Sequence, residues 1–102
     1  MEYSIVLYND AKEDIVEIAK WYDLKSVELS KRFIEQFDIA INKISKTPDA
    51  FSYLYDDVRK IRLHKFPYLI FYKVKEQTVF IYGVIHAKRN PYLYKKRLRI
   101  LL

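Results

Sequence analysis

Apolar positions in the first half of the chain recur at helical spacing in two segments. From 10 to 24 they form one stripe of a helix, made by Ala11, Ile15, Ile18, Ala19 and Tyr22. From about 27 to 46 a second stripe has the same period, made by Leu29, Phe33, Phe37, Ala40, Ile41 and Ile44. The pattern therefore predicts two amphipathic helices with a short link between them, and such a pair packs as an antiparallel hairpin.

Residues that begin and end helices flank both segments. Asp10 and Glu13 have the spacing of a capping box, which predicts Asp10 as the N-cap of the first helix. Ser26 is placed to cap the second helix. Thr47 and Pro48 end it, because proline disfavours the helical conformation in the residue before it.

Strand patterns lie on both sides of the predicted hairpin. Residues 3–8 are rich in β-branched and aromatic side chains and predict a short buried strand. A further strand begins at residue 58, and residues 68–74 and 78–85 are nearly continuous apolar runs, typical of strands covered at least in part on both faces. The order β-α-α-β-β-β predicts one α+β domain over 1–102, in which the helical hairpin packs on a small, mainly antiparallel sheet.

Charge is divided unevenly between the two halves of the chain. Residues 1–57 carry 7 Lys and Arg against 12 Asp and Glu, a net of −5; residues 58–102 carry 12 against 1, a net of +11, and the two add to +6. Alternation over 61–64 turns Arg62 outward together with Lys60, onto a face that the hairpin leaves open. Such a half fits contact with a polyanion, although an ordinary soluble surface or a patch covered by an acidic partner protein fits it too.

Composition excludes several kinds of site. The chain has no cysteine, so neither a disulfide framework nor a cysteine-based metal site or nucleophile can form. The two histidines, His64 and His86, have no metal-binding spacing, and we expect no metal and no cofactor. No apolar run has the length of a membrane helix and no secretory pattern begins the chain, so a cytoplasmic protein without a membrane partner is expected.

Two segments of the basic half resemble a known family. VRKIRL at 58–63, followed by FPY at 66–68 and IFYKV at 70–74, is similar to the ParE-like stretch "VRRL…L…FPY.I.Y.V". HAKRNP at 86–91 is similar to the "H..R.P" that the family carries near its last strand. Together with the element order, the chain thus resembles the RelE/ParE toxin superfamily, whose members are partners of a labile antitoxin in type II, or plasmid stabilisation, modules.

The resemblance implies one of two activities, because a fold does not determine function. ParE-like members poison DNA gyrase and are not nucleases, whereas RelE-like members cut mRNA in the ribosomal A site. RNA cleavage needs a base for the 2′-hydroxyl, cations for the pentavalent phosphorane and a donor for the leaving oxygen. In RelE-like toxins these roles fall to basic side chains and a tyrosine, and the resemblance carries them onto Lys60, Arg62, Arg89 and Tyr94.

One position departs from the RelE-like pattern. Leu69 stands where that branch has an arginine, and a leucine cannot supply charge to a phosphate. The departure favours a ParE-like, non-enzymatic inhibitor that arrests growth, with DNA gyrase as its target and a cognate antitoxin as its partner. The alternative is a RelE-like mRNA endoribonuclease that acts with the ribosome.

The candidate residues also have structural interpretations. Lys60 and Arg62 can be a solvated strand face, Tyr94 can be a packing residue, and a hydrogen-bonded structural role fits His86 better than that of a general base. Arg89 has the better claim to function, since it follows the last strand and loops at sheet edges often carry function.

Two aromatic features have competing interpretations. Loop packing is favoured over base stacking for the cluster of Phe51, Tyr53 and Tyr55. Trp21 lies beside the apolar stripe of the first helix, where the edge of the core and a contact with the antitoxin are both consistent with the pattern.

Overall fold

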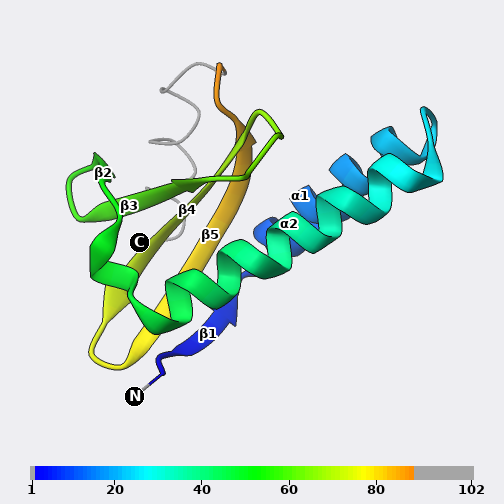
Figure 1. Ribbon diagram of the computed structural model, residues 1–102. Coiled ribbons are helices and arrows are strands. Elements are labelled where there is room, and N and C mark those ends of the chain that lie inside the picture. The colour runs from blue at the N-terminus through cyan, green and yellow to red at the C-terminus, as the bar shows by residue number, and fades with distance from the viewer. Residues whose placement is uncertain (1, 89–102) are drawn as a thin grey trace.

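The computed structural model describes residues 2–88, and the structural statements below concern that part of the chain. Its elements in chain order are β1 (Ser4–Leu7), α1 (Asn9–Asp23), α2 (Val27–Lys46), the 3-10 turn η1 (Pro48–Ala50), β2 (Tyr53–Tyr55), β3 (Val58–Arg62), β4 (Tyr68–Lys75) and β5 (Thr78–His86). The strands form a sheet in the order β1-β5-β4-β3-β2, in which β1 runs parallel to β5 and the other neighbours are antiparallel. The helices form a hairpin along one face of this sheet (Figure 1), so the predicted α+β architecture is confirmed.

The ends of the helices test the predicted caps. Ser26 caps α2 as predicted, since its Oγ accepts the Glu28 N–H at 3.2 Å. The capping box at α1 is wrong: Tyr8 is the N-cap, and Asp10 lies in the first turn. The Tyr8 N–H still donates to the Ile81 carbonyl of β5 at 3.1 Å, so the strand passes directly into the helix and leaves no separate capping residue.

The short strand β2 is the element that the sequence pattern missed. Tyr53 pairs with Arg59 and Tyr55 with Val58, with an irregular register between them. A loop was predicted over these residues, and that interpretation is wrong. Three residues are too few to show a period, and here the position is set by contacts with β3 rather than by local preference.

Apolar side chains cover the sheet on both faces. The main core lies between the sheet and the helical hairpin, and its fully buried members include Phe33, Ile44, Ile70, Tyr72 and Ile81. A second, smaller cluster on the opposite face contains Val58, Phe71, Tyr82 and Ile85. The prediction that the apolar strands are covered on both faces is confirmed.

A carboxylate connects α1 to the central part of the sheet. Pairing between β1 and β5 ends at Leu7 and Ile81, so within residues 2–88 the last part of β5 has no neighbouring strand on that side. The Val84 N–H instead donates to Asp14 Oδ2 at 2.9 Å. Satisfying a backbone donor in this way avoids the cost of leaving it unpaired, and it fixes α1 against β5.

The turn between the helices exposes apolar side chains. Trp21, Leu24 and Val27 are exposed, and the Trp21 ring meets the Tyr22 ring edge-on at 5.0 Å. Trp21 therefore lies at the edge of the core. Within residues 2–88, neither helix has the length and apolar content needed to cross a membrane.

Candidate functional site

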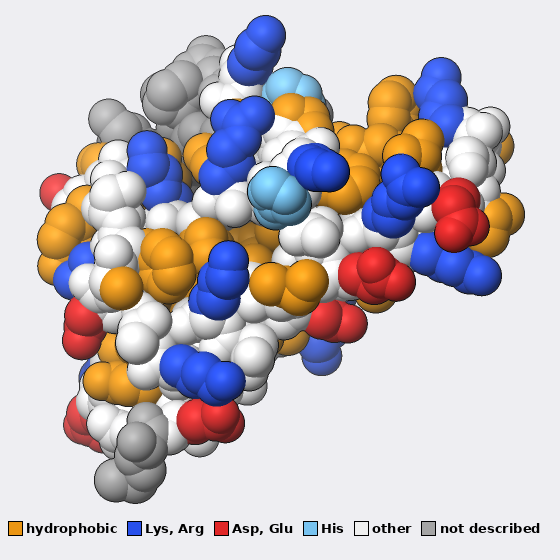
Figure 2. Space-filling model, in the orientation of Figure 1, with side chains coloured by type: hydrophobic (Ala, Val, Ile, Leu, Met, Phe, Trp, Pro, Cys, Tyr) orange, Lys and Arg blue, Asp and Glu red, His pale blue; other side chains and the backbone are white. Residues whose placement is uncertain are grey.

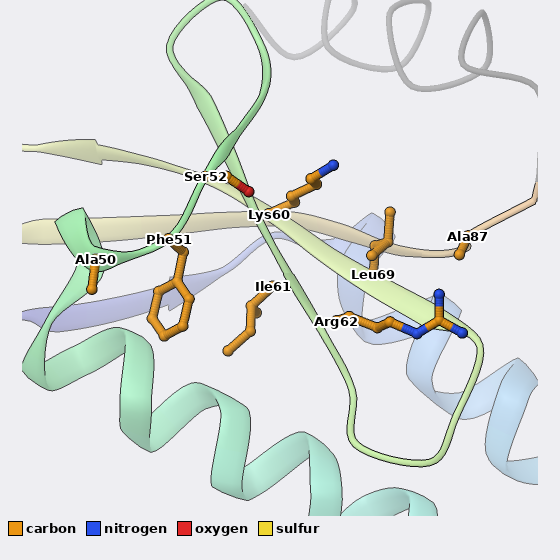
Figure 3. A pocket seen from close by; sticks show the side chains of 8 residues that line it. All are labelled: Ala50, Phe51, Ser52, Lys60, Ile61, Arg62, Leu69 and Ala87. Carbon is orange, nitrogen blue, oxygen red and sulfur yellow. The ribbon is translucent and has the colours of Figure 1, made fainter.

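An open groove lies beside β3, next to the segment that precedes β2. It has a volume of about 620 Å³, and its lining comprises Ala50, Phe51, Ser52, Lys60, Ile61, Arg62, Leu69 and Ala87 (Figure 3). We call this feature the basic groove. One wall is the segment 50–52, which precedes β2; β3 and its neighbour β4 supply most of the other lining residues, and Ala87 follows directly after β5.

Lys60 and Arg62 give the groove its charge. Strand alternation places both side chains on the same side of β3, away from the helical hairpin. Lys60 is half-buried beside Phe71 of β4, whereas Arg62 is exposed. Among the described residues neither forms an ion pair with a carboxylate. The prediction that these two cations share one face of the sheet is therefore confirmed, and their role remains a prediction.

Leu69 forms part of the same groove. It pairs with Arg62 across β3 and β4, and Figure 3 shows its side chain beside that of Arg62. An apolar side chain thus lies directly beside one of the two groove cations. Lys60 and Arg62 make the β3 side of the groove cationic, whereas Leu69 makes the adjoining β4 side apolar.

Arg59 also lies on β3, but its side chain does not line the basic groove. It faces the other side of the strand, where it pairs with Tyr72 of β4. Its Nη1 donates to the Phe51 carbonyl at 2.6 Å, and its Nη2 donates to the Tyr53 hydroxyl at 2.7 Å. Arg59 was not among the residues predicted to have a role, although its inward position in an alternating strand is a signal that could have indicated one.

A second anchor holds the start of the same wall. The buried Tyr72 hydroxyl donates to the Pro48 carbonyl at 2.7 Å. Burial raises the pKa of Tyr72 to about 12, while the nearby Arg59 acts in the opposite direction. The hydroxyl therefore stays protonated and remains a donor at neutral pH.

His86 lies away from the basic groove. Its ring meets the Tyr68 ring edge-on at 5.4 Å, and its Nδ1 accepts the Lys88 N–H at 3.1 Å. With Asp14 and Glu17 of α1 it lines a separate hollow of about 100 Å³. The structure thus brings together Lys60 and Arg62 but not His86, and a hydrogen-bonded structural role fits this histidine.

The remaining candidates fall beyond the last residue that the structure describes. Arg89 and Tyr94 lie outside residues 2–88, so their predicted roles stay predictions. Within that range, no three His, Asp or Glu side chains are grouped so that they could hold a metal ion. Lys and Arg side chains are spread over the visible face, both over the sheet and along the helices, while the acidic ones lie along the helices and toward the left and lower rim (Figure 2).

Comparison with known protein families assigns this sequence to one of them. The sequence profile of the family described as "ParE toxin of type II toxin-antitoxin system, parDE" matches residues 5–91. The chain belongs to the ParE toxin family. A sequence relative of this ParE-family toxin, Toxin ParE2 of Mycobacterium tuberculosis, is 28% identical over 86 residues, which are 83% of this chain and 82% of the relative.

Solved structures with the same fold come from both branches of the superfamily. A chain of the chromosomal ParDE toxin–antitoxin system of P. aeruginosa has a TM-score of 0.73 at 14% identity, covering 85% of this chain and 98% of its own. The E. coli toxin RelE, as a mutant in the free state, has a TM-score of 0.71 at 19% identity and covers all of both chains. The predicted superfamily and fold are confirmed, and the shared fold does not separate the two activities.

Proposed function

We propose that this ParE-family toxin arrests growth by inhibiting DNA gyrase without itself cutting nucleic acid. The observation that carries the proposal is Leu69 in the basic groove, opposite Arg62. The sequence relationship to the ParE family over residues 5–91 supports the same branch.

The physical reason concerns charge in the transition state of RNA cleavage. A pentavalent phosphorane carries additional negative charge, and an enzyme stabilises it with several donors or cations held close to it. Removing one well-placed donor from such a site typically lowers the rate by about 10²–10³. Leu69 supplies none, so the groove retains the charge for binding at Lys60 and Arg62 but lacks a full set of cations for cleavage.

The proposal includes a cognate antitoxin. A structural neighbour of this chain was solved as the toxin–antitoxin complex RelBE2 of M. tuberculosis, with a TM-score of 0.62. We propose that an acidic antitoxin covers the basic half of this toxin. Apolar anchors would supply most of its affinity and charges mainly the rate of association.

A ribosome-dependent mRNA endoribonuclease is the second candidate function. The observation that favours it is the placement of Lys60 and Arg62 on the same side of one strand and in one groove. The resemblance to RelE-like toxins would add Arg89 and Tyr94 to that site.

Two assays on one preparation of purified toxin test the assignment. The first measures supercoiling of relaxed plasmid by DNA gyrase, and the second follows the integrity of mRNA bound to ribosomes. We expect inhibition of supercoiling with mRNA left largely intact. Ribosome-dependent cleavage that disappears in both Arg62→Ala and Tyr94→Phe would place the endoribonuclease first.

A further inference from the structure

The clearest unexplained feature of the toxin is an arginine turned away from the basic groove. In the VRKIR sequence of β3, Lys60 and Arg62 line the groove, but the Arg59 side chain is only 16% exposed and lies on the other side of the strand. Burying a guanidinium is costly unless it is paired and hydrogen-bonded. Its partners therefore indicate what it does.

Among the described residues, the Arg59 side-chain hydrogen bonds, ion pair and cation–π contact all reach one short segment, 49–53. The guanidinium donates to the Phe51 carbonyl at 2.6 Å and to the Tyr53 hydroxyl at 2.7 Å. It also lies 4.0 Å from the centre of the Tyr53 ring, a cation–π contact. The exposed Asp49 carboxylate is 3.8 Å away and adds a weaker attraction.

This segment includes the wall of the basic groove. Two of its carbonyls are held by the sheet, Phe51 by Arg59 and Ser52 by the Lys60 N–H at 3.0 Å, and the carbonyl of Pro48 just before the segment accepts from the Tyr72 hydroxyl. The bond from Lys60 joins the wall to a residue that supplies groove charge. Two hydrogen bonds hold the wall at Phe51 and Ser52, and the one from Arg59 is the stronger because its donor is charged. The position of the wall relative to Lys60 thus depends on Arg59.

We infer that Arg59 is a positioning residue, whose guanidinium holds the 50–52 wall in place and thereby keeps the basic groove open to the target beside Lys60 and Arg62. The inference rests on the proposed function in one respect, that the groove contacts the target. Its structural half, the clamp on the wall, is independent of what that target is.

The experiment compares Arg59→Gln with Arg62→Gln in the full chain. Hydrogen exchange of the Lys60 N–H, followed by NMR, reports whether the 50–52 wall stays hydrogen-bonded to β3. Inhibition of gyrase supercoiling reports whether the basic groove still acts on the target. Arg59→Gln should speed exchange of the Lys60 N–H by at least about tenfold, the loss expected for one charge-assisted hydrogen bond, while amides shared by β4 and β5 keep their rates. It should also weaken inhibition by a similar factor.

The matched variant separates position from charge. Arg62→Gln should weaken inhibition to a comparable extent but leave exchange of the Lys60 N–H unchanged. Arg59→Lys keeps the cation on a single ammonium nitrogen but loses the planar fork that reaches both acceptors, so it should fall between wild type and Arg59→Gln in both readouts. If Arg59→Gln fails to fold, Tyr53→Phe removes the hydroxyl acceptor alone and should speed the same exchange by a smaller factor.

Several results would overturn the inference. Unchanged exchange of the Lys60 N–H in Arg59→Gln would show that Arg59 does not hold the wall. Faster exchange with full inhibition would show that the position of the wall does not affect function. A general rise in exchange over β4 and β5 would make Arg59 a residue of overall stability only. If wild-type toxin does not inhibit gyrase while Lys60 exchange still responds to Arg59, the clamp stands and the proposed target is wrong.

Discussion

At the residue scale, the two arginines of β3 lie in opposite surroundings. Arg62 is exposed in the basic groove, whereas Arg59 is three residues earlier on the other side of the strand and is enclosed by acceptors. Alternation alone accounts for this difference, because successive side chains of a strand point to opposite faces. Counting cations in the sequence therefore overstates the charge that the groove presents.

The first prediction concerns the buried tyrosines Tyr72 and Tyr82 at alkaline pH. Burial raises the pKa of Tyr72 and of Tyr82 to about 12, from an ordinary value of 10.0. The stability due to these groups is complete below the unfolded pKa and is lost as pH rises through the folded pKa, because the unfolded chain releases the proton first. We expect the free energy of unfolding, measured with urea, to fall between pH 10 and 12. Tyr72→Phe should reduce that slope by up to about 1.4 kcal/mol per pH unit.

The control for this prediction is Ile70→Val. Ile70 is buried in the same core but carries no titrating group, so shortening it should leave the alkaline slope as in wild type. A slope that does not change in Tyr72→Phe would show that other groups account for the alkaline loss of stability.

The second prediction concerns the cations assigned to the target surface. Arg62→Ala removes charge from the basic groove, and Arg89→Ala tests the family position that lies outside the described residues. Both should weaken growth arrest when the toxin is induced without an antitoxin. Lys12→Ala on the exposed side of α1 is the control and should leave arrest unchanged. Equal arrest by all three variants at equal soluble expression would separate the groove from toxicity.

At the scale of elements, hydrophobic period predicted the helices and the long strands but not what joins them. α1 and α2 lie within about a residue of their predicted bounds, since each carries several turns of apolar repeat. β2 was missed because three residues show no period. The hydrogen bond from Val84 to Asp14 could not be predicted either, since it joins residues 70 positions apart through the ending of β1.

The third prediction tests that connection between α1 and β5. Asp14→Ala leaves the Val84 N–H without its acceptor, which should lower the free energy of unfolding by about 1–3 kcal/mol. Urea unfolding followed by circular dichroism gives the value. Glu13→Ala, one residue earlier and exposed, is the matched control and should change stability by less than about 0.5 kcal/mol. Equal stability of the two variants would mean that the Val84 N–H finds another acceptor at no cost.

At the scale of the whole molecule, the candidate site was predictable only in part. Lys60 and Arg62 were chosen correctly as neighbours on one face, because β3 alternates and its side chains can be assigned from sequence. The 50–52 wall was not foreseen, because its place depends on a side chain, Arg59, that reaches across to a segment without its own period. Groove charge follows from local pattern, whereas groove shape follows from long-range contacts.

The last prediction concerns how the uneven charge of the toxin's two halves affects its association with the antitoxin. Residues 58–102 carry a net charge of +11, and an acidic partner approaching them is attracted over about a Debye length, ~10 Å at 0.1 M salt and ~3 Å at 1 M. Steering of this kind acts on encounter rather than on the packed complex. Stopped-flow mixing of toxin with its cognate antitoxin should therefore show an association rate that falls at least about tenfold from low to high salt, with a much smaller change in dissociation. Arg62→Glu should lower the association rate at low salt but lose most of its effect at high salt, whereas Lys12→Glu, placed away from the groove on α1, should have the smaller effect throughout. An association rate that is independent of salt would show that the basic half is not the face the antitoxin approaches.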